Sequence, residues 1–190
     1  MAKQPVRDQL VAGAADMLGR RGLRATSVRE LAKHSGAPLG STYHYFPGGK
    51  SQLAVEAVEF ADALTIRVLA DELASAGPIA GLSSFVDMWR DVVVKSDFRA
   101  GCPVLAVSVE EPGDDDAPLR AAAVAFEHWT SMLAESLRAH GADAQAAEQT
   151  ATLIVAAIEG TVAMCRAQRS TDALDRTADA LEHVVREITG

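Results

Sequence analysis

Residues 27–50 read SVRELAKHSGAPLGSTYHYFPGGK, and this segment combines two helix patterns with a tight turn. Ser27 and Glu30 stand three residues apart, just before an apolar pair. Their side chains can cap each other's backbone N–H groups, which is the pattern of a helix start. Gly36 favours the end of a helix, and Pro38 disfavours helical geometry at the residue before it. The pattern therefore predicts a short helix that begins at Ser27 and ends just before Gly36.

A second short helix is predicted from about Leu39 to Phe46, after a turn of about three residues. Leu39, Tyr43 and Phe46 recur at three- and four-residue spacing, so we expect them to form the inward face of this helix. The residues expected to face outward are Gly40, Ser41, Thr42 and His44. Two helices joined by a short turn that contains a glycine are typical of a helix-turn-helix.

Apolar residues recur at helical spacing through the rest of the chain as well. The segments with this pattern are residues 5–21, 50–74, 79–95, 119–140, 144–166 and 171–188. A short apolar segment, 104–109, contains branched residues typical of a strand, but we predict a helix because no partner strand appears elsewhere. The predicted fold class is therefore all-α, with about nine helices.

These helices divide the chain into two predicted domains. Residues 1–49 would form a three-helix head, which is too small to bury much surface alone. Residues 50–190 would form a helical body. We expect the helix over residues 50–74 to connect the two domains, because it follows directly on the chain break at residues 47–49, Pro-Gly-Gly.

The net charge of the chain, −8, is distributed unevenly. The first 52 residues contain eight Lys or Arg and three acidic residues, whereas the remainder contains ten and 23. The first segment therefore has a net charge of +5 and the rest has −13. A basic head of this kind is attracted to phosphate, while an acidic body repels non-specific association with nucleic acid.

The cysteines, Cys102 and Cys165, lie in dissimilar contexts without a Cys-x-x-Cys spacing. Neither a metal site nor a redox pair is therefore predicted, and we expect no cofactor. The chain opens without a leader-like apolar segment, and no apolar run approaches the roughly 18 residues of a membrane span. We expect a soluble, cytoplasmic protein without a membrane partner.

Residues 110–118 form an acidic run, EEPGDDDAP. Several neighbouring carboxylates suggest calcium binding, but their spacing does not match the Asp-x-Asp-x-Asp-Gly loop that wraps this ion. We expect a solvated loop.

Four short motifs stand together in the head. They are Gly22-Leu23, TSVRELA at residues 26–32, Gly36, and GSTYHYF at residues 40–46. Over roughly residues 5–65 this combination resembles the TetR family of bacterial transcriptional regulators. The run FPGGK at residues 46–50 is one residue longer than the general family pattern. With GCP at residues 101–103, it looks like the LmrA/YxaF-like subgroup of drug- or flavonoid-responsive repressors.

The resemblance implies that the head binds operator DNA. In such motifs the second helix lies in the major groove, while flanking groups hold phosphates. The residues nearest the bases would be Leu39, Gly40, Ser41 and Thr42. The phosphate contacts would be Thr26, Ser27, Arg29, Tyr43, His44 and Lys50. Four alternatives stay open: His44 as a merely exposed side chain, Ser27 as a helix cap only, Arg29 as a base contact, and Lys50 as a merely solvated side chain.

The resemblance also implies an effector site in the body. An apolar cavity with few polar groups suits a small apolar or aromatic effector, and Met supplies adaptable walls. The candidate lining residues are Phe85, Met88, Trp89, Cys102, Phe126, Trp129, Met132 and Met164. The alternative is that most of these side chains are plain core.

Broad apolar stripes on the last two predicted helices, 144–166 and 171–188, suggest a homodimer through these helices, although both could instead be core. The function that fits best is a ligand-responsive repressor released from a palindromic operator by its effector. The alternative is a helical small-molecule-binding protein or enzyme that does not bind DNA. Enzymatic chemistry is disfavoured because the five histidines are scattered without a nucleophile or metal-ligand spacing.

Overall fold

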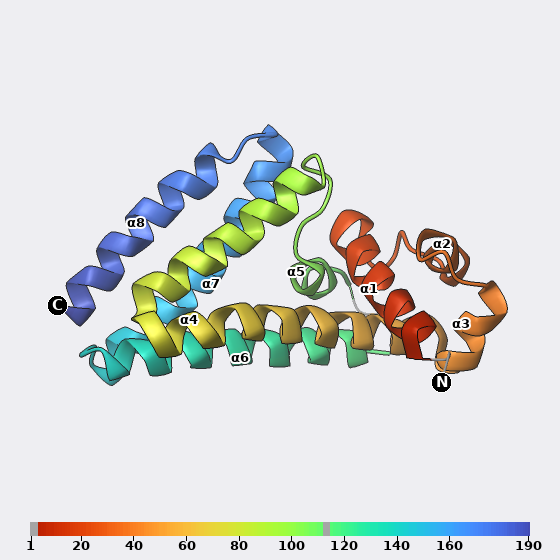
Figure 1. Cartoon of the computed structure of the whole chain (residues 1–190), viewed down its shortest axis with the longest axis horizontal. Coiled ribbons are helices and arrows are strands. Elements are labelled where there is room, and N and C mark those ends of the chain that lie inside the picture. Colours follow the sequence, from red (N-terminus) through yellow and green to blue (C-terminus); the bar gives the residue numbers. More distant parts are fainter. Residues whose placement is uncertain (1–3, 112–114) are drawn as a thin grey trace. The chain divides into compact units, whose positions relative to one another are not determined.

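The computed structural model describes residues 4–111 and 115–190, and within these ranges the chain forms helices and no strands (Figure 1). The eight helices are α1 (Gln4–Arg21), α2 (Val28–His34), α3 (Leu39–Tyr45), α4 (Gly49–Lys95), α5 (Pro103–Ser108), α6 (Ala117–Ala139), α7 (Ala144–Gln168) and α8 (Asp172–Thr189). The all-α prediction is confirmed.

Helix α4 contains a kink that separates the two helices predicted over residues 50–74 and 79–95. Gly77 has φ 82° and ψ −173°, a conformation that is essentially restricted to glycine. Pro78 follows it, and proline is well tolerated in the first turn of a helix. Counting α4 as two straight segments gives the nine helices that were predicted.

The segment predicted as a helix over residues 104–109 is helix α5 rather than a strand. Pro103 occupies its first turn, and the thiol of Cys102 accepts a hydrogen bond from the Leu105 N–H at 3.4 Å. The cap and the proline together favour a helical start at a place where branched residues alone would favour a strand.

The chain forms two compact units. The first comprises the described residues of 4–63 and 102–125, and the second comprises Leu64–Gly101 and Phe126–Gly190. Helices α4 and α6 each contribute to both units. The short helix α5, although distant in sequence, belongs to the same unit as the N-terminal helices. The domain boundary predicted between residues 49 and 50 stays a prediction.

The first unit is built around α1, which packs against α2, α3 and α5 (Figure 1). Its largest fully buried side chains are Leu10, Leu18, Phe46 and Leu53. They come from α1, the end of α3 and the start of α4, so the first turns of α4 complete the core that three short helices cannot form alone.

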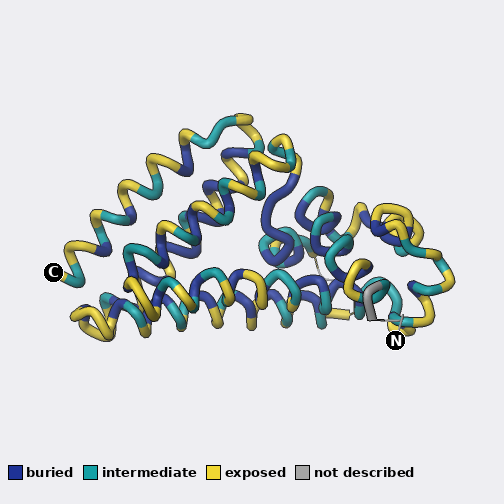
Figure 2. Tube along the Cα trace, in the orientation of Figure 1, coloured by how far each residue is buried: buried dark blue, intermediate teal, exposed yellow. Residues whose placement is uncertain are grey.

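In the second unit, α7 and α8 pack against each other. Along α8, the buried residues Leu174, Leu181 and Val185 are seven and four positions apart, a spacing that keeps them on one side of the helix. Figure 2 shows buried positions between exposed ones along this helix. Helix α7 is long and apolar enough to cross a membrane by length and mean hydropathy alone, and half of its most apolar window is buried within the structure. Core helices of soluble proteins have the same properties.

We expect Gly77→Ala to destabilise the protein by about 1–3 kcal/mol, because a residue with a side chain is strained in this conformation. An added Cβ would also lie 2.8 Å from Nε2 of His140. The matched control is Gly40→Ala in α3, where an added Cβ meets nothing within 4 Å. Urea unfolding measures both. Equal free energies of unfolding for the Gly77→Ala variant and the wild type would contradict the glycine-restricted conformation at residue 77.

Candidate functional site

The start of α2 has the predicted capping arrangement. Oγ of Ser27 accepts a hydrogen bond from the Glu30 N–H at 3.2 Å, and Oε2 of Glu30 accepts bonds from the Ser27 N–H at 3.1 Å and its hydroxyl at 2.8 Å. Hydrogen bonds from the Ser27 side chain and backbone lower the pKa of Glu30. Ser27 is therefore a helix cap in this structure, whatever else it contacts on DNA.

The turn between α2 and α3 also follows the sequence signals. Gly36 has φ 65°, in the left-handed region that glycine accepts readily. The Ala37 N–H bonds to the Ala32 carbonyl at 2.9 Å, which closes the end of α2. Pro38 then precedes the first residue of α3.

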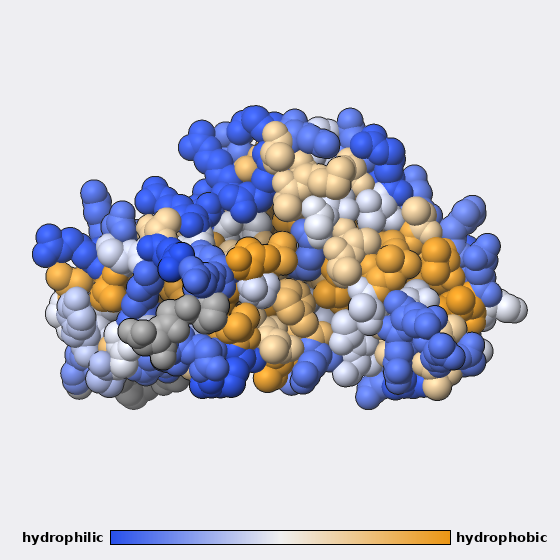
Figure 3. All heavy atoms as spheres, turned by 180° about the vertical axis from the view of Figure 1, so that it is seen from behind, coloured by the Kyte–Doolittle hydropathy of each residue, from blue (hydrophilic) through white to orange (hydrophobic). Residues whose placement is uncertain are grey.

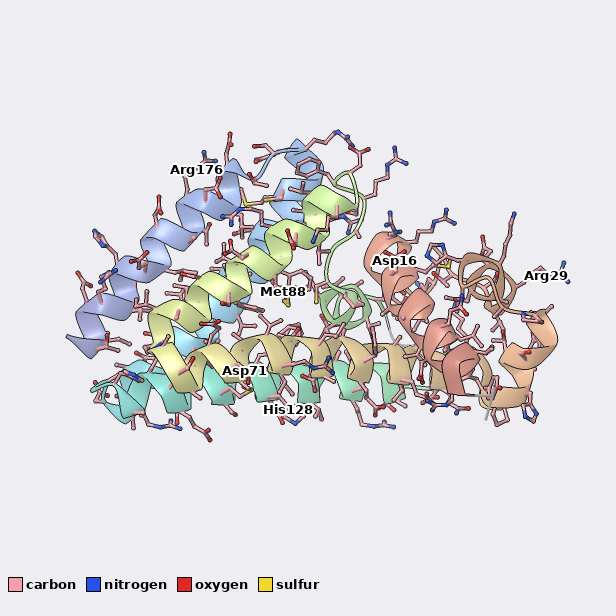
Figure 4. All side chains as sticks on the ribbon, in the orientation of Figure 1. Asp16, Arg29, Asp71, Met88, His128 and Arg176 are labelled. Carbon is pink, nitrogen blue, oxygen red and sulfur yellow. The ribbon has the colours of Figure 1, made fainter. Side chains whose placement is uncertain are left out.

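A second link holds the end of α2 against α1. Oδ2 of Asp16, labelled in Figure 4, accepts from Nε of Arg20 at 2.8 Å and lies 2.7 Å from Nε2 of His34. Burial raises the pKa of Asp16, but the hydrogen bonds with Arg20 and His34 outweigh it, so the net shift is downward. Asp16 therefore stays ionised between two basic side chains.

The orientation of α3 differs from the prediction. Thr42 is buried, with 1% of its surface exposed, whereas Tyr43 is 57% exposed. The predicted inward face contained Tyr43 and the outward face contained Thr42, and both assignments are wrong. Phe46 is fully buried, and Thr42 lies one turn before it on the same side of the helix. Tyr43 is roughly 100° further round the helix and so points away.

The outward face of α3 consists of exposed Gly40, Tyr43 and His44, with Leu39 and Ser41 half-buried beside them. An added Cβ at Gly40 would meet nothing within 4 Å, so the backbone here is open to close approach. The rings of His44 and Tyr45 pack edge to face, with centroids 5.2 Å apart. This face combines an accessible backbone with aromatic and hydrogen-bonding side chains.

Thr26 is also buried, with 2% of its surface exposed, and its hydroxyl donates to the Gly22 carbonyl at 2.7 Å. The hydroxyl closes the turn between α1 and α2 instead of lying at the surface. The side chains of Thr26 and Thr42, both predicted to contact DNA, are thus inside the head. Their burial follows from the packing of α2 and α3, which the residue spacing alone did not determine.

Cationic groups flank the face of α3. Arg29 is exposed on α2 and extends away from the helices (Figure 4). Lys50 lies in the first turn of α4, and its Nζ donates to the Arg24 carbonyl at 3.4 Å. Lys50 is therefore held beside the turn between α1 and α2. Arg24, which lies next to it, did not stand out from the general positive charge of the head in the sequence.

The acidic run contributes contacts that the sequence did not indicate. The Glu110 carboxylate accepts hydrogen bonds from the N–H groups of Leu23 at 2.7 Å and Arg24 at 2.8 Å. Oδ2 of Asp115 accepts a bond from the Ser51 hydroxyl, and Oδ1 caps the start of α6. Residues 112–114 of the predicted loop lie outside the described residues. For the Glu110 contact, the structure adds that Gly22 has a positive φ, which exposes the successive N–H groups of Leu23 and Arg24.

The candidate effector residues lie mostly in the second unit, where Phe85, Trp89 and Trp129 form a buried cluster. The ring of Phe85 packs edge to face with those of Trp89, at 6.4 Å, and Trp129, at 6.0 Å. Phe126 packs on Trp129 at 5.5 Å. The Nε1 donor of Trp89 is buried and has no hydrogen-bond partner among the described residues.

The other candidates are less enclosed. Met88, labelled in Figure 4, and Met132 are half-buried. Met164 is 47% exposed, because the buried side of α7 runs through residues such as Ile158 and Cys165, and Met164 faces away from it. Met164 therefore does not line the interior of its own subunit. Cys102 belongs to the first unit, where it caps α5.

A shallow groove lies between α4 and α8, apart from all of these candidates. It is lined by Leu82, Ser83, Val86, Asp87, Arg90, Ala178 and Glu182. Arg90 bonds to Asp175 at 2.7 Å and pairs with Asp87 as well, which fixes α8 to α4. The hydrogen bond to Asp175 is the main cause of a raised pKa at Arg90, and the contact with Asp87 adds to it. The charges at this groove are thus already paired.

Comparison with known proteins agrees with this architecture. Residues 10–57 match the family model for bacterial regulatory proteins of the tetR family. Residues 78–180 match the model for the C-terminal domain of LmrA/YxaF-like transcriptional regulators. The two models together span the head and most of the body.

An uncharacterized HTH-type transcriptional regulator of Mycobacterium tuberculosis is 38% identical over 178 residues, which cover 90% of each chain. The HTH-type transcriptional regulator LmrA of Bacillus subtilis is 32% identical over 156 residues, covering 81% of this chain and 82% of LmrA. The crystal structure of regulatory protein TetR from Rhodobacter sphaeroides has the same fold, with a TM-score of 0.83, 23% identity, and coverage of 93% and 97%. The chain therefore belongs to the TetR family of transcriptional regulators and has a C-terminal domain of the LmrA/YxaF-like type.

Proposed function

We propose that this protein is a cytoplasmic, homodimeric repressor that binds a roughly palindromic operator and is released by a small apolar or aromatic effector. The observation that supports operator binding most strongly is the outward face of α3. Gly40, Tyr43 and His44 are exposed there, while Thr42 and Phe46 anchor the opposite side in the core. A helix held in this way can enter a major groove without losing its packing.

The exposed residues suggest a division of roles. Gly40 and Ser41 would approach the base edges, because a glycine permits close approach and a hydroxyl bonds to either donors or acceptors. Tyr43, His44 and Lys50 would hold phosphates on either side of the groove, with Arg29 at the start of α2. Thr26 and Thr42 would act by shaping the head, since their side chains are buried.

The surface of α7 supports a dimer through the last two helices. Small and apolar residues recur every three to four positions along its exposed side. They are Leu153, Ala156, Gly160, Ala163, Met164 and Ala167. In the view of Figure 3, hydrophobic residues lie among hydrophilic ones. Side chains this small allow two helices to approach closely, as an isologous interface of two helices from each subunit requires.

The aromatic cluster supports an effector that is itself aromatic or apolar. Its rings already pack edge to face, and an aromatic guest can take the same geometry against them. The buried Nε1 donor of Trp89 would bond to an acceptor atom on the effector, since a buried donor gains most from a partner. The effector class is thus a small ring compound with at least one hydrogen-bond acceptor.

Operator binding is tested by gel shift on the DNA upstream of the protein's own gene, with random DNA as the reference. We expect Lys50→Ala to weaken binding to both DNAs and to reduce the slope of log K against log salt by about one. Lys95→Ala, at the far end of α4, is the matched control and should change neither. An unchanged salt slope for Lys50→Ala would contradict the assignment of Lys50 as a phosphate contact. Equal affinity of the wild type for the two DNAs would contradict the proposed function.

We expect Met164→Glu to convert the dimer into monomers at micromolar concentrations, because the charge would be buried without a partner in the interface. Val124→Glu on α6 is the control, since Val124 is 46% exposed and Met164 47%. Sedimentation velocity measures the assembly state of both variants. A Met164→Glu variant that stays dimeric would place the interface elsewhere.

Trp89 and Trp129 are the two tryptophans of the chain, so intrinsic fluorescence reports directly on the cluster. We expect planar aromatic compounds with an acceptor group to change this fluorescence, and Trp89→Phe to weaken their binding roughly fivefold through the lost hydrogen bond. Operator DNA should weaken effector binding by the same factor by which the effector weakens operator binding. Effector affinity that does not depend on operator DNA would exclude release by the effector.

A further inference from the structure

The turn between α1 and α2 is closed by a carboxylate from a distant part of the sequence. Gly22 has φ 77°, and the next two N–H groups converge into a small anion-binding concavity of the kind called a nest. The Glu110 carboxylate occupies it, with one oxygen 2.7 Å from the Leu23 nitrogen and the other 2.8 Å from that of Arg24. A Cβ at Gly22 would lie 2.0 Å from Oε1 of Glu110, so glycine is needed for the approach as well as for φ.

The turn that Glu110 closes leads directly into α2. The Thr26 N–H bonds to the Leu23 carbonyl at 3.1 Å, and the Thr26 hydroxyl bonds to the Gly22 carbonyl at 2.7 Å. Ser27, the next residue, caps α2. The position of the helix start is therefore set by a short chain of bonds that begins at the Glu110 carboxylate.

The same turn also holds Lys50. The N–H of Arg24 donates to Glu110, and its carbonyl accepts from Nζ of Lys50 at 3.4 Å. The backbone of Arg24 is thus bonded on both sides, to Lys50 of α4 through its carbonyl and to Glu110, two residues after the end of α5, through its N–H. A shift of the turn would move the carbonyl that orients the Lys50 ammonium.

We propose that Glu110 is a positioning residue for operator binding: its carboxylate fixes the turn at Leu23 and Arg24 and thereby orients Lys50 toward the DNA backbone. The inference rests on the proposed function, because it concerns the phosphate contact assigned to Lys50. Glu110 itself touches no DNA in this account.

Simple charge repulsion predicts the opposite effect. A carboxylate in a basic head repels phosphate, so its removal should by itself strengthen DNA binding. Glu111 provides the matched case: it is exposed, it carries the same charge, and its carboxylate pairs with Nη1 of Arg24 at 3.5 Å without bonding to any backbone N–H that the structure records. If Glu110 acts by positioning, removing its carboxylate should weaken DNA binding. If only charge repulsion acts, removing the carboxylate of either Glu110 or Glu111 should strengthen it.

The experiment measures operator affinity of the full-length protein by gel shift across a range of salt concentrations. We expect Glu110→Ala to weaken binding roughly tenfold, the order of effect of losing hydrogen bonds to a charged group. Glu111→Ala should leave affinity unchanged or raise it. Glu110→Gln keeps the volume and one carbonyl acceptor and should fall between Glu110→Ala and the wild type, and it serves as the test if the alanine variant unfolds in thermal denaturation.

A double-mutant cycle with Lys50→Ala separates positioning from a general loss of structure. If Glu110 acts through Lys50, the single variant Glu110→Ala should reduce the salt dependence of operator binding. In a protein that already carries Lys50→Ala, the same substitution should change operator affinity little further. Additive losses would contradict the link to Lys50.

Failure of the proposed function and failure of the positioning role of Glu110 would give different results. If the wild type does not prefer its operator over random DNA, the proposed function fails. If the wild type does prefer it, and Glu110→Ala and Glu110→Gln bind as tightly as Glu111→Ala, operator binding stands and the positioning role of Glu110 is overturned.

Discussion

The burial of Phe46 is the constraint on which the orientation of α3, and so its outward face, depends. Its ring is fully buried, and the Arg7 guanidinium lies over it at 5.6 Å from the ring centroid. Arg7 in turn pairs with Glu56 on α4, so the end of α3 is tied to α1 and α4 together. Because α3 has only seven residues, one anchored position at its end sets the rotation of the whole helix. Thr42 is thereby turned inward and Tyr43 outward.

Distant segments complete what the short helices cannot hold alone. Leu53 on α4 joins the core of the head, α5 packs on α1, and the Glu110 carboxylate closes the turn before α2. The first unit is therefore made of elements from two separate parts of the sequence. A shift of α5 would move Glu110 and so change the bonds to Leu23 and Arg24 that lead into α2.

The sequence predicted the features that arise from neighbouring residues. The Ser27 and Glu30 cap and the break between residues 74 and 79 each depend on signals within a few positions, and the structure contains both. Helix α5 was predicted on another ground, the absence of a partner strand, and the structure contains it as well. The rotation of α3 could not be predicted, because Leu39 and Phe46 fit a face with either Thr42 or Tyr43, and tertiary packing selects one. The Glu110 contact joins residues 86 and 87 positions apart, a separation at which residue spacing carries no information. The exposure of Met164 likewise follows from which side of α7 packs inside the subunit.

In the proposed dimer, two copies of the outward face of α3 would contact the operator together. Hydroxyl-radical footprinting on the operator tests this arrangement most directly. We expect two protected half-sites on one face of the duplex, with centres separated by one helical turn or a multiple of it, about 34–36 Å per turn. Protection of a single half-site, or uniform protection without a repeat, would contradict it.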